Sequence, residues 1–337
     1  MNSLERKDAR LAWTLLAPSL LIVALIAFYP LGMVFYNSFT DKGFATNTKV
    51  SYVGLANYKR LLGLEIVPLP RGDERTRSLA AQERLSRGFR LVGVARLFGS
   101  SFAIGGTDPD FISAVSDTLA FTVVSVLLET ILGMIVALVL VSNFPGRGAV
   151  RMSMLIPWAV PTAVSSKMWA WMFSSTRAGV VNVVCQALGI TDGQFSFLTT
   201  ASTQLWAMIA IDVWKTTPFM ALLLMAGLQM IPRELYEASR VDGCGAFRQF
   251  WKITLPLLKS SLAVALVFRT LDALRVFDLF QIIFAQQRYS MASFAYYQLI
   301  DNRKMGYSSA ASVVIFLVIS IFIVIYGRLS GGSDERN

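Results

Sequence analysis

Apolar residues along this chain gather in long runs that are separated by shorter polar segments. Six runs are long enough for helices that cross a bilayer, because about 20 mainly apolar residues span its hydrocarbon core. The predicted spans are Leu11–Phe35, Phe111–Val141, Met152–Phe173, Gln204–Leu228, Leu262–Ala285 and Ser308–Tyr326. Basic residues precede the first run as in a signal peptide, but the run is too long and no small-x-small cleavage site follows it. We therefore expect it to be retained, in an all-α membrane protein with six transmembrane helices.

Basic residues in the short loops predict how these spans are oriented, because cytoplasmic loops carry an excess of Lys and Arg. With a cytoplasmic N-terminus, twelve basic residues lie in inner segments and only four in short outer loops. The inner residues are Arg6, Lys7, Arg10, Arg147, Arg151, Arg233, Arg240, Arg248, Lys252, Lys259, Arg328 and Arg336, and the outer ones are Arg177, Arg288, Arg303 and Lys304. The segment 37–110 is too long for the rule and is not counted. Both termini are therefore predicted to be cytoplasmic.

The spans divide the chain into predicted regions. Residues 1–36 form the N-terminal cytoplasmic tail and first helix, 37–110 an extracytoplasmic loop, 111–328 a core of five helices that includes a cytoplasmic loop at 229–259, and 329–337 a solvated cytoplasmic tail. Within the outer loop, Arg75 to Phe98 fits a basic amphipathic helix. Such a helix could lie on an anionic membrane or dock a partner, or it could simply pack on the ends of its own spans.

Composition agrees with the membrane prediction and removes several other classes. The chain is 55% apolar and 15% charged, whereas soluble domains are about 45–50% apolar and about 25% charged. The absence of histidine excludes His-dependent metal sites and Ser-His-Asp triads. Cys185 and Cys244 fall on opposite sides of the predicted membrane, so neither a disulfide nor a metal site is expected. In a soluble protein a net charge of +10 would suggest nucleic acid, but here the placement of the basic residues matters more than their sum, and we predict a lipid bilayer as the partner.

The cytoplasmic segment 229–259 predicts two short helices joined by a glycine turn. Ile231-Pro232-Arg233-Glu234 is a helix start, because proline and acidic residues suit the first turn of a helix. Asp242-Gly243 ends the first helix, Ala246–Ile253 forms the second, and Leu255-Pro256 precedes the fifth span. A rigid projection of this shape is typical of a segment that docks into a groove on another protein.

These residues also match a known pattern. Glu237-Ala238-Ser239-x-x-Asp242-Gly243-Cys244, followed by Phe250 and Ile253-x-Leu255-Pro256, resembles the EAA loop of ABC-importer permeases. Ser239 and Cys244 stand where the family pattern has alanine. Val53-Gly54-Leu55-x-Asn57-Tyr58, Asp117-Thr118-Leu119-x-Phe121-Thr122 and Trp214-x-x-x-Pro218-Phe219 are similar to segments of sugar permeases of the maltose/trehalose type. The resemblance covers nearly the whole chain, and residues from about Gly63 to Gly106 look like an insertion.

The resemblance implies a type I ABC-importer permease fold and a function. The chain would be a permease subunit that forms half of a pathway for a trehalose- or maltose-like sugar or related glycoside, by alternating access. Implied partners are a second homologous permease, two ATPase subunits that hold ATP and Mg, and an extracytoplasmic solute-binding protein, all at a bacterial inner membrane. The chain has no G-x-x-x-x-G-K-[ST] segment, so we expect no bound cofactor and no enzyme activity. The ATPase-coupling residues implied by the resemblance are Glu237, Ala238, Ser239, Asp242, Gly243, Cys244, Phe250, Ile253, Leu255 and Pro256.

Ionisable residues lie inside four predicted spans, where each costs roughly 2.5–3.5 kcal/mol near the helix centre. They are Glu129, Lys167, Asp212, Lys215, Arg269, Asp272, Arg275 and Asp278. The last four alternate in sign at i, i+3 spacing, which puts partners within reach on one slowly rotating helix face. The charged residues of spans four and five either line a polar sugar pathway or form a salt-bridge lattice that locks these two spans together. We favour the lattice for Arg275 and Asp278.

For the remaining charges the resemblance favours the pathway. Counted from the EAA loop, the positions where the maltose permease contacts its sugar are Asp212, Lys215, Thr216, Phe219, Arg269, Asp272 and Val276, with Phe219 as an aromatic platform. Three alternatives stay open: a permease for another binding-protein-delivered solute such as a glycerol-phosphate or modified sugar, a stand-alone transporter, and an intramembrane enzyme that uses the buried acids. Pro157 and Pro161 are predicted to kink the third span.

Overall fold

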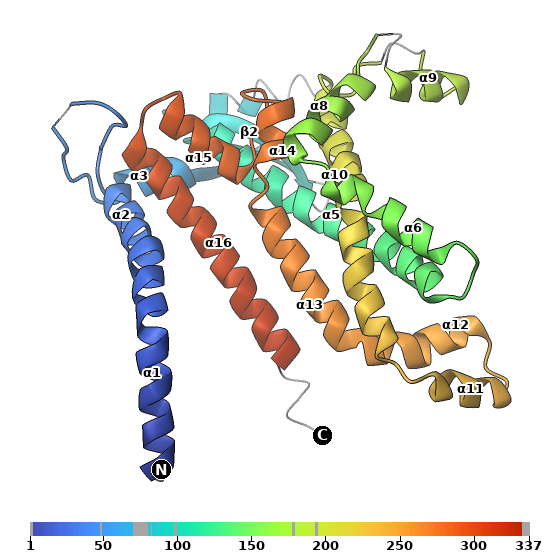
Figure 1. Ribbon diagram of the computed structural model, residues 1–337. Coiled ribbons are helices and arrows are strands. Elements are labelled where there is room, and N and C mark those ends of the chain that lie inside the picture. The colour runs from blue at the N-terminus through green and yellow to red at the C-terminus, as the bar shows by residue number, and fades with distance from the viewer. Residues whose placement is uncertain are drawn as a thin grey trace. The chain divides into compact units, whose positions relative to one another are not determined.

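The computed structural model describes residues 3–47, 49–69, 80–81, 83–97, 100–176, 179–192 and 195–331 of the 337-residue chain. The predicted tail from Gly332 onward and the outer-loop Arg177 lie outside these residues. The chain is mostly helical (Figure 1). It forms two compact units. Unit 1 holds residues 1–109 and 294–317, and unit 2 holds residues 110–293 and 318–337.

Unit 1 starts with a long helical segment made of α1 (Ser3–Val23), a π-helical turn η1 (Ala24–Phe28) and α2 (Tyr29–Ser38). Residues Leu11–Ser38 have the length and hydropathy of a membrane span, and none of their most apolar window is buried inside the chain. Because so many exposed apolar side chains would be unfavourable in water, this segment needs lipid or another protein around it. The structure agrees with the predicted first span.

The motif Val53–Tyr58 shapes the turn that follows α2. Asn57 donates hydrogen bonds from Nδ2 to the carbonyls of Ser38 and Thr40 (both 2.9 Å), and the Tyr58 hydroxyl donates to Ser38 Oγ (2.6 Å). The short helix α3 (Ala56–Leu62) carries both residues. A Cβ on Gly306, at the start of α16, would lie 2.0 Å from the Thr40 carbonyl, so glycine is required for this close approach. The motif thus has a structural role in unit 1.

Three strands, β1 (Leu64–Leu69), β2 (Arg90–Leu97) and β3 (Ser100–Gly106), form a small antiparallel sheet in the order β1-β3-β2. Leu64 pairs with Gly106, so the two ends of the predicted insertion lie side by side. The sheet is a small part of a mostly helical chain, which agrees with the predicted fold class. It corrects one prediction, because residues 90–97 are a strand where part of the amphipathic helix 75–98 was expected. Successive residues of β2 pair with β3, with an irregularity in the register between Leu91 and Gly93. This strand pairing overrides the helical spacing of the apolar residues in the segment.

Unit 2 is built around three helices: α5 (Pro109–Val141), α10 (Ala201–Gln229) and α13 (Leu255–Leu274). Small residues let them approach closely, because a Cβ on Gly133 of α5 would lie 2.8 Å from Met220 Cγ, and one on Gly227 of α10 would lie 2.5 Å from Ser261. The remaining helices of this unit are α6 (Arg147–Met154), α7 (Ile156–Ala159), α8 (Thr162–Met172), α9 (Val180–Ala187), α11 (Arg233–Val241), α12 (Ala246–Gln249), η2 (Phe250–Thr254) and α14 (Asp278–Ile283). Helices α15 (Met291–Ile300) and α16 (Met305–Gly331) contribute to both units.

Asp117 and Thr118, which belong to another of the recognised motifs, fasten the start of α5 to the segment before α15. Arg288 forms a two-pronged ion pair with Asp117, with Nε–Oδ2 and NH2–Oδ1 distances of 2.6 Å. The backbone N–H of Met291 donates to Thr118 Oγ1 (3.0 Å). This motif is therefore structural as well.

The predicted third and fifth spans are discontinuous. Four helical segments in the described part of the chain are long and apolar enough to cross a membrane unbroken: Leu11–Ser38, Pro109–Val141, Ala201–Gln229 and Met305–Arg328. The third predicted span is divided among α6, α7 and α8, with extended backbone at Val160 and Pro161. The fifth ends as a helix at Leu274 and restarts at Asp278. The prolines explain the first break, since they remove backbone donors.

Candidate functional site

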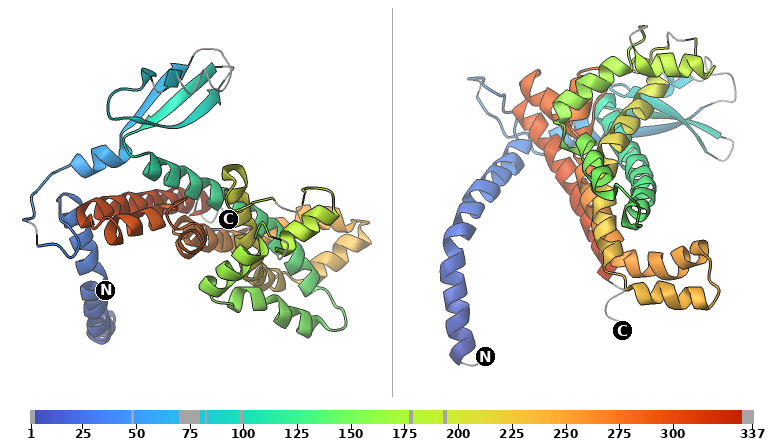
Figure 2. Two further views of the ribbon diagram at one scale, coloured as in Figure 1. Left: turned by 90° about the horizontal axis from the view of Figure 1, so that it is seen from above. Right: turned by 45° about the vertical axis from the view of Figure 1, so that its right-hand side comes forward.

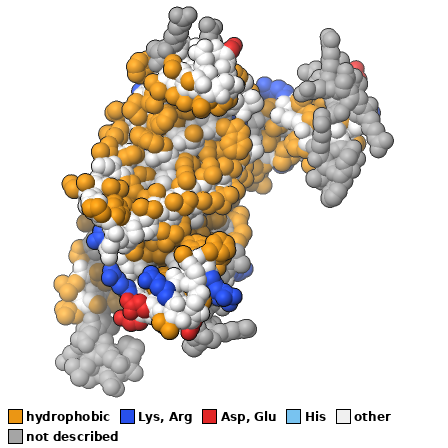
Figure 3. All heavy atoms as spheres, turned by 90° about the vertical axis from the view of Figure 1, so that its right-hand side faces the viewer, with side chains coloured by type: hydrophobic (Ala, Val, Ile, Leu, Met, Phe, Trp, Pro, Cys, Tyr) orange, Lys and Arg blue, Asp and Glu red, His pale blue; other side chains and the backbone are white. Residues whose placement is uncertain are grey.

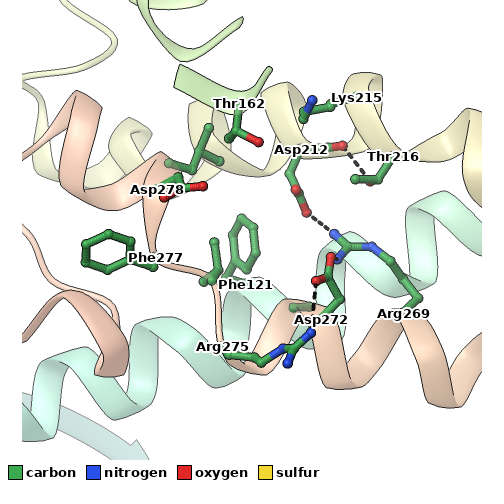
Figure 4. Close-up of a pocket in the computed structure, with 13 residues that line it drawn as sticks. Phe121, Thr162, Asp212, Lys215, Thr216, Arg269, Asp272, Arg275, Phe277 and Asp278 are labelled. Carbon is green, nitrogen blue, oxygen red and sulfur yellow. Dashed lines mark hydrogen bonds and ion pairs between the residues drawn. The ribbon is translucent and has the colours of Figure 1, made fainter. Parts of the chain in front are cut away.

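A polar pocket of about 190 Å³ lies where α5, α8, α10 and α13 meet (Figure 4). Six of the seven predicted substrate-binding residues line it: Asp212, Lys215, Thr216, Arg269, Asp272 and Val276. Phe121, Thr162, Arg275, Phe277 and Asp278 complete much of the wall. Both helix breaks border the pocket, and irregular backbone at membrane depth is tolerated only where it is buried in protein or lines a polar cavity.

Phe219 is the predicted site residue that the pocket lacks. Its ring stacks on Trp158 of α7, with centroids 5.7 Å apart and planes 8° from parallel. The pair joins α10 to the segment before the Val160–Pro161 break. The aromatic rings that do line the pocket belong to Phe121 and Phe277. Phe277 lies between α13 and α14, and no motif in the sequence marked it as a site residue.

Arg269 is the centre of a buried ion cluster. Its guanidinium pairs with Glu129 of α5 through two nitrogens, one of them at an NH2–Oε1 distance of 2.9 Å, and it also pairs with Asp212 of α10. A third pair links NH1 to Asp272 Oδ2 at 3.2 Å. The Arg269 side chain is 3% exposed and that of Glu129 is 0% exposed. Arg269 therefore ties three membrane helices together from the inside.

Glu129 is a partner of Arg269 that the i, i+3 spacing of charges along the chain did not predict. Asp212, Asp272 and Asp278 each have a basic residue three positions away, whereas Glu129 has apolar residues at 126 and 132. A buried carboxylate without a local partner has to find one on another helix, because an uncompensated charge there is costly. The Thr216 hydroxyl, which also lines the pocket, donates to Glu129 Oε1 (2.6 Å). An acid without a basic neighbour in the sequence was thus the feature that could have predicted this contact.

The predicted lattice of Arg275 and Asp278 is wrong. Arg275 pairs with Asp272 one turn earlier on its own helix, at 3.8 Å, and does not reach α10. Asp278 belongs to the next helix, since the chain leaves the helical path between Leu274 and Asp278. The bracing role therefore falls to Arg269, while Asp272 and Arg275 present mostly exposed side chains (63% and 68%) to the pocket.

Lys215 has a defined contact at the other helix break. Its ammonium group donates to the backbone carbonyl of Val160, the residue at which α7 gives way to extended backbone. A carbonyl at a broken helix end loses its normal intrahelical donor. Lys215 supplies a replacement, so the pocket and the break in the third span are built by the same residues.

The loop between α10 and α13 forms a rigid projection, which we call the coupling loop (residues 230–254). Helix α11 ends in a Schellman motif: Gly243 N–H donates to the Arg240 carbonyl (3.0 Å) and Cys244 N–H to the Ser239 carbonyl (2.9 Å). Gly243 has φ = +75°, which favours glycine. The predicted glycine turn between two helices is therefore present.

Buried hydrogen bonds hold the two sides of the coupling loop together. Gln249 donates from Nε2 to Ser239 Oγ (2.7 Å), and the hydroxyls of Tyr236 and Thr254 lie 2.9 Å apart. Figure 2 shows α11 and α12 running side by side, in agreement with these bonds. Ser239, which replaces an alanine of the family pattern, thus gains a partner that alanine could not bind.

The predicted coupling residues divide into an exposed and a packed set. Glu237, Ala238, Asp242, Gly243 and Pro256 are exposed, whereas Ser239, Cys244, Phe250, Ile253 and Leu255 are buried or half-buried. Large exposed apolar side chains that the motif did not include stand beside the first set: Leu235, Val241, Phe247 and Trp251, of which Val241 is 88% and Phe247 79% exposed. Exposed apolar side chains on a polar loop mark a surface for another protein.

Within the part of the chain that the structure describes, no cluster of His, Cys, Asp or Glu could hold a metal ion. The chemistry available in the pocket is therefore hydrogen bonding and charge from Asp, Lys, Arg and Thr side chains beside two phenylalanine rings. These groups can bind a polar solute, since ligand sites combine an apolar lining with a few placed polar groups.

Comparisons with known proteins fit this architecture. Residues 129–332 match the family described as "Binding-protein-dependent transport system inner membrane component". The trehalose/maltose transport system permease protein MalF of Thermococcus litoralis is 45% identical over 62% of this chain and 71% of its own length. The trehalose transport system permease protein SugA of Mycobacterium tuberculosis is 30% identical over 97% of this chain and 92% of its own length.

A solved structure shows the same fold. A chain of a bacterial alginate ABC transporter, crystallised with an alginate-bound periplasmic protein, superposes with a TM-score of 0.70 at 19% identity, over 97% of this chain and 96% of that one. The chain belongs to the family of binding-protein-dependent transport system inner membrane components. The predictions of an importer-permease fold and of a transport component without enzyme activity are confirmed.

The ion cluster generates a prediction about stability. Replacing Arg269 by leucine leaves Glu129 and Asp212 as neighbouring buried carboxylates without a counter-charge. Breaking a buried pair in this way costs about 3–5 kcal/mol. We expect the thermal unfolding midpoint in detergent to fall by several degrees and the yield of folded protein to drop. The matched control, Arg275→Leu, removes a mostly exposed arginine from the end of the same helix and is expected to shift the midpoint little. Equal midpoints for both variants would contradict the central role of Arg269.

Proposed function

We propose that this chain is the permease subunit of an ATP-driven importer for a trehalose- or maltose-like sugar or a related glycoside. The observation that carries the proposal is the polar pocket, which is built at two broken membrane helices from six of the predicted sugar-contact residues. Its carboxylate, ammonium, guanidinium and hydroxyl groups offer the hydrogen bonds that a neutral sugar needs. The names of the two relatives, trehalose/maltose and trehalose permeases, support the same class of solute.

In this proposal the chain supplies half of a pathway and a second, homologous permease supplies the other half. A solute-binding protein delivers sugar from outside, and the pocket is exposed first to that side and then to the cytoplasm. Asp272, Lys215 and Thr216 hold the sugar hydroxyls, and Val276 contributes apolar contact. Arg269 lines the pocket with only the small exposed part of its side chain. Phe219 contributes through its stack with Trp158, which positions α7 beside α10.

Force for this cycle comes from two ATPase subunits that bind ATP and Mg and receive the coupling loop in a cleft. Glu237, Ala238, Asp242 and Gly243 present the contact surface, and Leu235, Val241, Phe247 and Trp251 add apolar area to it. Ser239, Cys244, Phe250 and Ile253 pack within the loop, and Leu255 and Pro256 begin α13, to which the loop is joined. The distribution of Lys and Arg supports a cytoplasmic position for this loop and for both termini of the chain in a bacterial inner membrane.

The turn of the coupling loop provides the first test. Valine at position 243 would be held at φ = +75°, a strained conformation for a β-branched residue, whereas position 245 has φ = −73° and equally open space for a Cβ. We expect Gly243→Val to reduce co-purification of the ATPase and sugar uptake at least tenfold, while Gly245→Val retains both. Full recovery of ATPase and uptake in the Gly243 variant would remove the coupling role.

The pocket provides the second test. Asp272→Asn removes an exposed charge without changing its shape, and hydrogen bonds to charged groups are worth about 1.5–3 kcal/mol. In cells with the whole transporter we expect trehalose or maltose uptake to fall roughly tenfold or more while the complex is recovered intact. Asp110→Asn, an exposed acid at the start of α5 outside the pocket, serves as the control. Loss of the complex, instead of uptake alone, would show that Asp272 is structural.

The two cysteines allow a direct test of orientation. Cys185 lies on α9 and Cys244 in the coupling loop, and both are partly exposed. In intact spheroplasts a membrane-impermeant maleimide is expected to label Cys244→Ser protein, through Cys185, and to spare Cys185→Ser protein. Inside-out vesicles are expected to give the reverse pattern. Labelling of Cys244 from the outside would invert the proposed topology.

A further inference from the structure

A second cavity, separate from the polar pocket, lies beside the coupling loop. It measures about 1020 Å³ and is bordered by the ends of α5 and α10, by α6 and by the coupling loop. Four arginines line it, Arg147 and Arg151 from α6 and Arg233 and Arg240 from α11, against a single carboxylate, that of Glu237. On the face seen in Figure 3, Lys and Arg side chains gather in the lower part, below a broad band of apolar side chains.

The four arginines have no acidic partner in the described part of the chain: no carboxylate oxygen lies within 4.0 Å of their guanidinium nitrogens. Arg147 donates to the Asn143 side-chain oxygen (3.1 Å), and Arg151 donates to the Leu140 carbonyl (2.7 Å). Nε of Arg151 is buried without any hydrogen-bond partner. Clustered like charges and an unpaired buried donor are both unfavourable, so a bound anion would stabilise this arrangement.

Apolar side chains also line the cavity. Leu138 and Val141 come from the last turns of α5, Leu228 comes from the end of α10, and Phe250 comes from the coupling loop. Leu138 is also part of the exposed apolar surface of α5, which has the composition of a membrane span. The cavity thus combines several guanidinium groups with apolar side chains at the end of membrane helices. A phospholipid has the complementary pattern, with an anionic phosphate joined to acyl chains.

We propose that this cavity binds the phosphate group of an anionic phospholipid of the cytoplasmic leaflet. Guanidinium groups suit phosphate because they can donate two parallel hydrogen bonds to its oxygens, and basic pockets between membrane helices on the cytoplasmic side recognise such headgroups. A phosphate between Arg151 of α6 and Arg240 of α11 would link the membrane core to the coupling loop. The choice of leaflet rests on the proposed function, whereas the phosphate site itself does not.

The experiment uses the purified full-length chain in neutral detergent and measures binding by native mass spectrometry and by the shift in thermal unfolding. The probes are phosphatidylglycerol, phosphatidylcholine and inorganic phosphate. The test variant is Arg151→Gln/Arg240→Gln, and the matched control, Arg248→Gln/Arg328→Gln, removes two exposed arginines outside the cavity. We expect phosphatidylglycerol to bind the wild type and the control equally and the test variant at least tenfold more weakly, with no shift from phosphatidylcholine or inorganic phosphate.

Two other outcomes would overturn the proposal. One is equal binding of phosphatidylglycerol by the test variant and the wild type, and the other is equal binding of phosphatidylcholine and phosphatidylglycerol by the wild type. Binding of millimolar inorganic phosphate that displaces the lipid and is lost in the test variant would keep the phosphate site but assign it to a soluble ligand. Should the test variant not fold, Arg147→Gln/Arg233→Gln carries the same expectation. Because no ATPase is present, failure here is distinct from failure of the coupling assignment, and cysteine labelling separately decides the leaflet.

Discussion

The contact between Arg269 and the carboxylates of Glu129 and Asp212 is the interaction on which the rest of unit 2 depends. Each group alone would be costly inside a membrane, and together they are compensated only while α5, α10 and α13 keep their relative positions. The cluster does not guarantee high stability, since buried ion pairs often contribute little net free energy. It does specify which helix faces meet, and it sets one wall of the polar pocket.

The same constraint explains why the pocket coincides with broken helices. Backbone groups released at Val160 and near Arg275 need partners that lipid does not provide. Lys215 supplies one such partner, and the pocket gives the other break access to polar surroundings. The helix interruptions, the buried charges and the polar pocket are therefore parts of one arrangement. A conformational change that moves α7 and α8 relative to α10 would alter all three together, as alternating access requires.

The coupling loop is built in the opposite way, as a stiff polar element outside the apolar core. Its Schellman turn and the buried Gln249–Ser239 bond fix its shape locally. Phe250 packs into the apolar cluster around Met220 and Leu258, which gives the loop a firm base. The arginine-lined cavity lies at this base, so an anion bound there would act on the segment that joins the loop to the membrane helices.

Local and periodic features of this protein were decided by the sequence itself. Long apolar runs specify membrane helices because lipid offers no other way to satisfy the backbone, and Asp242-Gly243 specifies a helix end because glycine tolerates φ > 0. Tertiary structure decided what depends on distant partners. Residues 90–97 became a strand because β3 pairs with them. Arg269, and not Arg275, links the helices, because Glu129 faces it from α5. These two residues are 140 positions apart in the sequence, so their spacing could not reveal the contact. Phe219 does not line the pocket, because its ring stacks on that of Trp158. Spacing along the chain fixes which groups share a helix face, but only packing brings separate helices together.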